Sequence, residues 1–184
     1  MKPHLSMRRG RLRPATSGDL SALLELLHDK DVRRYLCDNT ILPRETVASM
    51  LADSERLAVG GLGLWMIEAP DGGLIGAAGL HPVSDAMSAV PELRGGIEPI
   101  IALAPTSWRQ GLAAEAVGAL ITYARQSLRL AQLVAAVDEP NVRSRQLMLR
   151  CGFVPVGQTE GPANTLILYC LRFDDNAEQT DGHP

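Results

Sequence analysis

The chain has 184 residues, which is enough for one domain with a substantial core. Hydrophobic residues make up 46% and charged residues 21%, a composition typical of folded globular proteins rather than disordered chains. The formal net charge of −3 excludes the basic footprint of a nucleic-acid-binding domain, so no nucleic-acid partner is expected.

The cysteine, histidine and hydropathy patterns narrow the class further. The three cysteines are far apart and none forms a C-x-x-C pair, which indicates reduced thiols in a cytoplasmic protein. The four histidines show no metal-ligand spacing, so no metal site is expected. No apolar run approaches the ~18 residues that span a bilayer. No apolar segment follows the basic N-terminus, so neither a secretory signal nor a membrane partner is expected.

The N-terminal third is expected to hold one strand and a helical layer. Residues 16–19, Thr-Ser-Gly-Asp, match a capping box, in which a hydroxyl residue precedes an acid by three positions. The leucines that follow recur at helical spacing, which is typical of one buried helix face. The expected elements are a flexible tail at 1–9, a strand at 11–14, a helix at 20–27, a helical turn at 31–37 and a helix from Pro43.

The rest of the chain alternates strands with helices, which predicts one α/β domain over residues 10–173 with a mixed sheet and helices on both faces. Pro70-Asp71-Gly72 favours a hairpin, because proline and glycine preset the turn angles. Pro99 cannot donate to a ladder, so it indicates a sheet edge or a bulge that would open the sheet. The remaining expected elements are strands at 64–68 and 74–80, a polar connection at 82–95, a strand at 96–103, a helix to about 127, a strand at 133–137, a helix at 141–150, strands at 154–156 and 165–173, and a disordered tail at 174–184.

The stretch from Trp108 to Ala116 joins a strand to a helix through Gly111. The first four N–H groups of a helix have no intrahelical partner, and these donors together with the helix dipole favour an anion, most readily a phosphate. Gly111 and Ala113 have little or no side chain, so a ligand can approach the backbone closely. The stretch therefore predicts a phosphate-binding loop, although glycine at a helix start is also common in turns that bind nothing.

Two motifs in this order resemble those of the GNAT N-acetyltransferases, and within them the ribosomal-protein N-terminal acetyltransferase branch. The segment Pro105-x-x-Trp108-Arg109-Gln110-Gly111-Leu112-Ala113-Ala114-Glu115-Ala116 is similar to the family's acetyl-coenzyme A loop, Q/R-x-x-G-x-G/A. The segment Asn141-Val142-Arg143-Ser144, followed by Cys151-Gly152-Phe153, is similar to the family's N-x-x-S/A…L-G-F helix. The resemblance covers roughly residues 11–173. It implies a single-domain fold with a mostly antiparallel, six- to seven-stranded sheet splayed at its centre, and an acetyl-CoA-dependent N-acetyltransferase.

The resemblance also implies a set of cofactor-binding residues. Backbone N–H groups of the loop would bind the coenzyme pyrophosphate, and the preceding strand would pair its backbone with the pantetheine arm where the sheet opens. Asn141 would bond to the pantetheine or order the gap between strands, while its alternative role is a helix N-cap. The implied cofactor-binding residues are Ile101, Ala102, Leu103, Arg109, Gln110, Gly111, Leu112, Ala113, Ala114, Asn141 and Ser144.

Acetyl transfer to an amine needs a base, because a primary amine is mostly protonated at neutral pH, with a pKa of about 7.7–8.0 for an α-amino group and about 10.4 for lysine. Glu98 is the leading candidate, since it lies on the strand before the loop and the family branch often has glutamate there. Its alternative role is to bind a cationic substrate or to face solvent. Glu92 and His81 are weaker candidates, because both lie near polar loops.

The general acid is less clear from the sequence. Many family members use a tyrosine seven residues after the asparagine, but this chain has Met148 there, which cannot donate a proton. Ser144 is the substitute, since it shares an inward helical face with Met148 and Cys151. Its hydroxyl has the alternative of bonding back to its own helix. Cys151 as a covalent acetyl carrier is disfavoured, so direct attack in a ternary complex is expected.

The acceptor amine is left open between a protein N-terminus and a small amine, and the protein is expected to be a monomer or a homodimer. A competing hypothesis is a non-catalytic acyl-CoA-binding module of the same fold, which the missing tyrosine favours. A nucleotide-binding protein is disfavoured, because neither G-K-S/T nor G-x-G-x-x-G occurs.

Overall fold

The computed structural model describes residues 2–173. Their strands form two sheets, and every hydrogen-bonded strand pair is antiparallel. One sheet has the order β1-β2-β3-β4-β5 and the other β6-β8-β7. The strands are β1 (Leu5–Met7), β2 (Gly10–Pro14), β3 (Gly63–Glu68), β4 (Leu74–Pro82), β5 (Ile97–Leu103), β6 (Gln132–Asp138), β7 (Val154–Glu160) and β8 (Thr165–Arg172).

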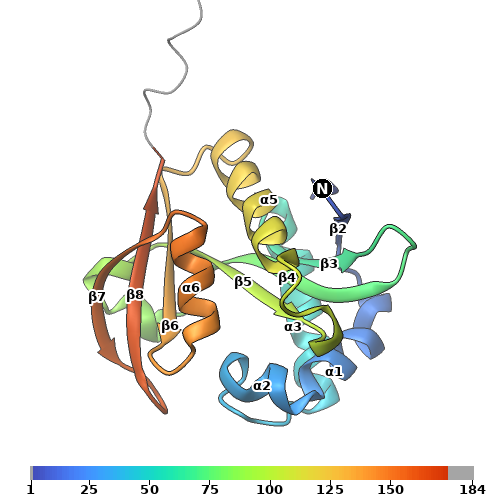
Figure 1. Ribbon diagram of the computed structural model, residues 1–184, viewed down its shortest axis with the longest axis horizontal. Helices are drawn as coiled ribbons and strands as arrows, with labels where there is room; N and C mark the ends of the chain where they lie inside the picture. Colours follow the sequence, from blue (N-terminus) through green and yellow to red (C-terminus); the bar gives the residue numbers. More distant parts are fainter. Residues whose placement is uncertain (1, 174–184) are drawn as a thin grey trace, which may run out of the picture.

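Helices cover both faces of the five-stranded sheet, as predicted. In Figure 1, α5 crosses one face, α1, α2 and α3 gather on the other, and α6 lies against the three-stranded sheet. The α-helices are α1 (Leu20–His28), α2 (Lys30–Leu36), α3 (Arg44–Leu57), α4 (Asp85–Ser88), α5 (Leu112–Gln126) and α6 (Val142–Arg150). No helix within residues 2–173 combines the length and the apolar character needed to cross a bilayer.

Strand alternation explains why the sheet carries a helical layer on each side. On β3, Trp65 and Ile67 pack in the cluster that contains Leu120 of α5, whereas Leu64 and Met66 pack in the cluster of α1 and α3. Successive side chains of a strand point to opposite faces, so one apolar strand supplies two cores. Both faces of β3 are therefore buried.

The N-terminal residues correct the prediction of a flexible tail at 1–9. Residues 5–7 form β1, which pairs with β2 as a hairpin. The Lys2 ammonium donates to Ser54 Oγ at 2.9 Å and to the Leu64 carbonyl at 2.6 Å, and it lies 4.5 Å from the centre of the Trp65 ring. Burial lowers the Lys2 pKa to about 8. These partners are more than 50 residues away in sequence, so local spacing gave no sign of them.

The sheet also differs from the sequence-based expectation in its connectivity. The described residues hold eight strands rather than six or seven, and they form two separate hydrogen-bonded sheets rather than one mixed sheet. β5 lies next to β6, but no hydrogen-bonded pairing joins them. The β4–β5 register is continuous, so Pro99 marks an edge rather than a bulge. The predicted tail at 174–184 lies outside the described residues.

Removing residues 1–9 is expected to destabilise the fold, which tests the role of the N-terminal hairpin. Leu5 is buried, and burial of one leucine contributes about 1.5–3 kcal/mol. One kcal/mol shifts the melting temperature by about 2–4 °C in a chain of this size, so we expect a fall of about 5 °C or more in calorimetry. The control is Arg8→Gln, because the Arg8 side chain is 79% exposed and such surface pairs contribute little. An unchanged melting temperature in the shortened chain would show that the hairpin is dispensable.

Candidate functional site

Two prolines fix the phase of the β4–β5 ladder, that is, which residues of each strand point their N–H and C=O groups toward the other strand. Pro99 lies opposite Leu80, and Pro82 lies opposite Ile97. In an antiparallel pair, residues whose N–H and C=O point to the partner alternate with residues whose groups point away. A proline has no N–H to give, so both prolines suit the positions that point away. The bond from the Ala104 N–H to the Ile75 carbonyl, at 3.0 Å, agrees with this phase.

The odd-numbered residues of β5 consequently point their backbone groups into the gap beside β6. Ile101 presents both its N–H and its C=O there, and neither group has a partner within residues 2–173. The Leu103 carbonyl accepts the indole N–H of Trp108 at 2.7 Å, so only its N–H remains open. Ala102 pairs with Ala77 of β4 instead. The predicted run at 101–103 is therefore corrected: the Ala102 backbone is engaged inside the sheet.

The loop between β5 and α5 collects unpaired N–H groups. Arg109 and Gly111 have left-handed φ angles of 62° and 79°, a geometry that makes successive N–H groups line an anion-binding concavity. Within residues 2–173 no acceptor meets the backbone N–H of Arg109, Gln110 or Gly111. Leu112 and Ala113 occupy the first helical turn, where N–H groups have no intrahelical acceptor. The Ala114 N–H, which was also predicted to bind phosphate, bonds to the Gly111 carbonyl at 3.1 Å.

Two arginines that the sequence analysis did not identify hold this loop. The Arg143 guanidinium of α6 lies 4.8 Å above the Trp108 ring, which links the loop to the second sheet layer. From the other side, Arg9 donates to the Gln110 carbonyl at 2.5 Å and to Glu115 Oε1 at 2.8 Å. Arg9 precedes the loop by about 100 residues, so only the folded hairpin reveals this contact.

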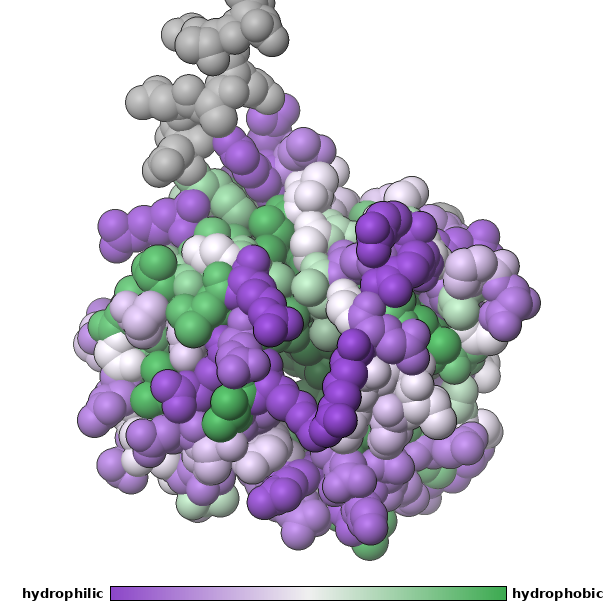
Figure 2. All heavy atoms as spheres, viewed as in Figure 1, coloured by the Kyte–Doolittle hydropathy of each residue, from purple (hydrophilic) through white to green (hydrophobic). Residues whose placement is uncertain are grey.

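The gap beside β5 opens to the surface. Figure 2 shows a hollow on this face, with hydrophobic residues at its floor and hydrophilic residues around its rim. In the same orientation, Figure 1 places α6 on one side of the hollow, the loop before α5 on the other, and β5 behind it. The backbone groups of Ile101 and the N–H groups of the loop belong to the elements that border this hollow.

α6 begins at Asn141, whose Oδ1 accepts the Ser144 N–H at 3.2 Å. Asn141 therefore acts as the N-cap of α6, which is the alternative role considered for it above. Ser144 is half-buried, and its hydroxyl makes no hydrogen bond to any of residues 2–173, so bonding back to its own helix is not observed. Met148 lies on the same face and is buried in the main core. Cys151 ends the helix, and burial raises the pKa of its thiol, which disfavours a nucleophilic thiolate.

Glu98 is partly buried on β5, directly opposite His81 of β4. Its side chain shares a sheet face with Ala77, which packs among α1 and α3. Burial raises the Glu98 pKa to about 7. A carboxyl with this pKa is divided between its two protonation states at neutral pH, which is the property of a general base. Glu92, the other acidic candidate, is exposed in the turn Pro91–Leu93 and lies near Gly157 of β7.

Gly111→Ala is expected to destabilise the fold, because an alanine with φ near 79° pays about 1–2 kcal/mol. Gly118→Ala is the matched control on the same helix. A Cβ at Gly118 meets no atom within 4 Å, and alanine in a helix interior gains up to about 1 kcal/mol over glycine. Urea unfolding should therefore move the two midpoints in opposite directions. Equal shifts would contradict the left-handed assignment at Gly111.

Glu98→Gln is expected to change how stability depends on pH. The pKa of Glu98 is raised in the folded state, so its contribution to stability is present at acid pH and is lost as the pH rises from the unfolded value of 4.5 through about 7. Glutamine carries no such charge, so the variant should gain stability over wild type between pH 5 and pH 8. Melting temperatures across this range measure the difference. Parallel curves would show that the carboxyl is not buried.

Comparison with known proteins agrees with this geometry. The sequence profile of the acetyltransferase (GNAT) domain matches residues 9–154. The uncharacterised N-acetyltransferase YoaA of Bacillus subtilis (strain 168) is 29% identical over 159 residues, which cover 85% of this chain and 86% of YoaA.

Solved structures share the fold. An acetyltransferase from Agrobacterium tumefaciens str. C58 has a TM-score of 0.78 at 20% identity, covering 94% of this chain and 96% of its own. RimL, a ribosomal L7/L12 alpha-N-protein acetyltransferase solved with coenzyme A, has a TM-score of 0.77 at 17% identity, covering 94% and 99%. Because the profile spans well over half of the sequence, the chain belongs to the GNAT acetyltransferase family.

Proposed function

We propose that this protein transfers an acetyl group from acetyl-CoA to a primary amine by direct attack within a ternary complex. The observation that carries the proposal is one continuous backbone surface. The open edge of β5 at Ile101 leads through Leu103 into the loop at 109–113, and both parts present N–H groups that have no partner in the described part of the chain. An extended amide-containing arm that ends in a pyrophosphate is complementary to such a surface.

Each part of the surface has a place in this proposal. The N–H groups of residues 109–113 bind the pyrophosphate, because they combine a left-handed turn with a helix N-terminus. Ile101 and the Leu103 N–H pair with the amides of the pantetheine arm. Trp108 and Arg143 border the arm where it passes between the two sheets. The structure of RimL in complex with coenzyme A supports the choice of ligand.

Glu98 is the proposed base. An acceptor ammonium loses a proton to the Glu98 carboxylate, and the free amine then attacks the thioester carbonyl. Its partly buried position and its pKa of about 7 allow it to accept a proton near neutral pH. The carbonyl is polarised by a backbone N–H of the open strand, for which Ile101 has the free group.

Ser144 is the proposed donor to the departing sulfur. Within the described residues its hydroxyl has no partner, and it is half-buried on α6, whereas the neighbouring Met148 is buried and has no proton to give. A hydroxyl is a weak acid, so it stabilises the thiolate by hydrogen bonding and water supplies the proton. The lack of a strong acid at Ser144 and Met148 favours one second candidate, a non-catalytic acyl-CoA-binding module.

The acceptor is proposed to be a protein N-terminus or a small primary amine. RimL acts, by its name, on a ribosomal protein N-terminus, which makes peptides the first acceptors to test. An α-amino group has a pKa of about 7.7–8.0, close to that of Glu98, so its proton can pass to this carboxylate with little cost. A lysine side chain, with a pKa of about 10.4, is a poorer match.

Glu98→Gln is expected to lower turnover by about 10²–10⁴-fold while leaving acetyl-CoA affinity unchanged, because the residue faces the opposite side of β5 from the helix α5 layer. The measurement is thiol release with acetyl-CoA over a panel of peptides and small amines, with calorimetry for coenzyme binding. In wild type the rate should rise with pH through about 7, as the carboxyl loses its proton. Ser144→Ala should lower turnover less.

Several outcomes separate the candidates. Coenzyme binding without thiol release for any amine would favour the non-catalytic module. Wild-type turnover in the Glu98→Gln variant would remove this carboxylate from the mechanism. Tight ATP binding together with weak acetyl-CoA binding would contradict both candidates.

A further inference from the structure

A second polar residue lies opposite the proposed base, on the neighbouring strand. His81 of β4 is the register partner of Glu98, and their side chains share one face of the sheet. Pro82 and Pro99 occupy the positions that point away, so the backbones of His81 and Glu98 are the ones that hydrogen-bond to each other. In such a backbone pair the Cα atoms lie about 5.5 Å apart. No hydrogen bond joins the imidazole and the carboxyl within residues 2–173, and Nε2 is buried, so one bridging water at Nδ1 is the route that this separation allows.

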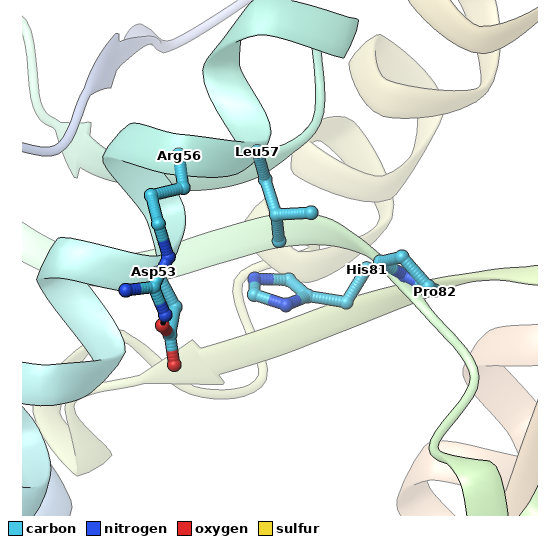
Figure 3. Close-up of a pocket in the computed structure, with 5 residues that line it drawn as sticks. All are labelled: Asp53, Arg56, Leu57, His81 and Pro82. Atoms are coloured by element: carbon cyan, nitrogen blue, oxygen red, sulfur yellow. Dashed lines mark ion pairs between the residues drawn. The ribbon is translucent and has the colours of Figure 1, made fainter.

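The imidazole is buried on one side and open on the other. Its Nε2 has no exposed surface and no hydrogen-bond partner within residues 2–173. The ring also lines a hollow of about 310 Å³ together with Pro82 and three residues of α3, namely Asp53, Arg56 and Leu57. Figure 3 shows the ring pointing from β4 toward α3, between Leu57 and the pair of charged side chains. Buried polar atoms without partners are rare, and each such atom calls for a reason.

Burial keeps the ring neutral, and its Nε2 is unpaired within residues 2–173. Asp53 pairs with Arg56, so neither is bonded to the imidazole. Burial, and next the positive charge of Lys2, lower the His81 pKa. The charged and titratable groups that face the ring are thus Lys2, Glu98, Asp53 and Arg56. A neutral imidazole next to a carboxyl that must be emptied of its proton can accept that proton.

We propose that His81 relays the proton that Glu98 takes from the acceptor amine to water in the hollow beside α3. The inference rests on the proposed acetyl transfer. The ammonium gives a proton to the Glu98 carboxylate, and the carboxylic acid passes it to one nitrogen of His81. The imidazolium then releases a proton from that same nitrogen, Nδ1, to water in the hollow, because Nε2 is buried, and both residues return to their starting protonation states. His81 is a relay and not a group that touches the reacting carbonyl.

The hollow makes the relay testable by chemical rescue, because removal of the ring leaves a space that imidazole from solution can enter. His81→Ala should lower turnover on the order of 10²-fold, the lower range for a proton-transfer group. Added imidazole should then raise the rate of this variant several-fold in a saturable manner, and it should leave wild type unchanged. His4→Ala is the matched control, since His4 is exposed and lies on the N-terminal segment. It should show neither the loss nor the response.

His81→Gln guards against misfolding of the alanine variant. Glutamine keeps most of the volume and can form hydrogen bonds, but it cannot carry a proton, so its loss in turnover should match that of His81→Ala with coenzyme affinity retained. Wild-type turnover in His81→Gln, or no response of His81→Ala to imidazole, would overturn the relay. Either result leaves the proposed function standing if Glu98→Gln is inactive. Absence of thiol release from wild type with every amine would overturn both.

Discussion

The phase of the β4–β5 ladder is the constraint on which the rest of the site depends. Pro82 and Pro99 lack an N–H, so both must lie where the backbone points away from the partner strand. A slip of β5 by one residue would move Pro99 into a bonded position and leave a carbonyl of β4 unpaired inside the sheet. The same slip would turn Glu98 from the layer of α1 and α3 toward α5. Two residues without donors therefore determine which backbone groups face the gap and which side chains face the layer of α1 and α3.

The open edge of β5 can persist because other interactions satisfy part of it. Trp108 occupies the Leu103 carbonyl, and Arg143 packs on the Trp108 ring from the second sheet layer. The gap between the sheets is thus bridged by side chains at its end, where a β-ladder would otherwise continue to β6. Arg9 and Glu115 hold the other side of the loop, which keeps the left-handed turn at Arg109 and Gly111 in place. An edge with few local bonds is stabilised from two distant parts of the chain, the N-terminal hairpin and α6.

These observations explain which features could be read from the sequence. Local rules were sufficient where the determinant lies within a few residues. Thr16 and Asp19 form the predicted capping box, Asn141 caps α6, and Pro99 lies on an edge. They failed where the determinant is a partner far along the chain. Nothing near residues 2–9 signals the burial of Lys2 or the ion pair of Arg9, because their partners are on α3, β3 and α5.

The failure at Ala102 has a different cause. Motif spacing treats residues 101–103 as one segment. In a strand, however, the backbone groups of odd- and even-numbered residues point in opposite directions, and which set faces the partner is known only once one bonded pair is known. The pairing of β4 with β5 likewise places His81 and Glu98 on one face of the sheet. The sequence did not indicate this, because the loops that flank the two residues are both polar. The residues were identifiable as candidates from their chemistry, but their relation to each other was not.

The two halves of the site accordingly differ in how they depend on the sequence. The cofactor side consists mainly of backbone groups, so most side chains there can vary provided that the left-handed turn at Gly111 is preserved. The proposed acceptor side depends on Glu98 and His81, two polar groups that burial disfavours in their charged forms. Groups of this kind reduce stability wherever they lie, and an apolar pair in the same register would pack against α3 without that cost. Their position opposite each other, at the end of the sheet where the hollow opens, is the strongest structural reason to regard this face as the reactive one.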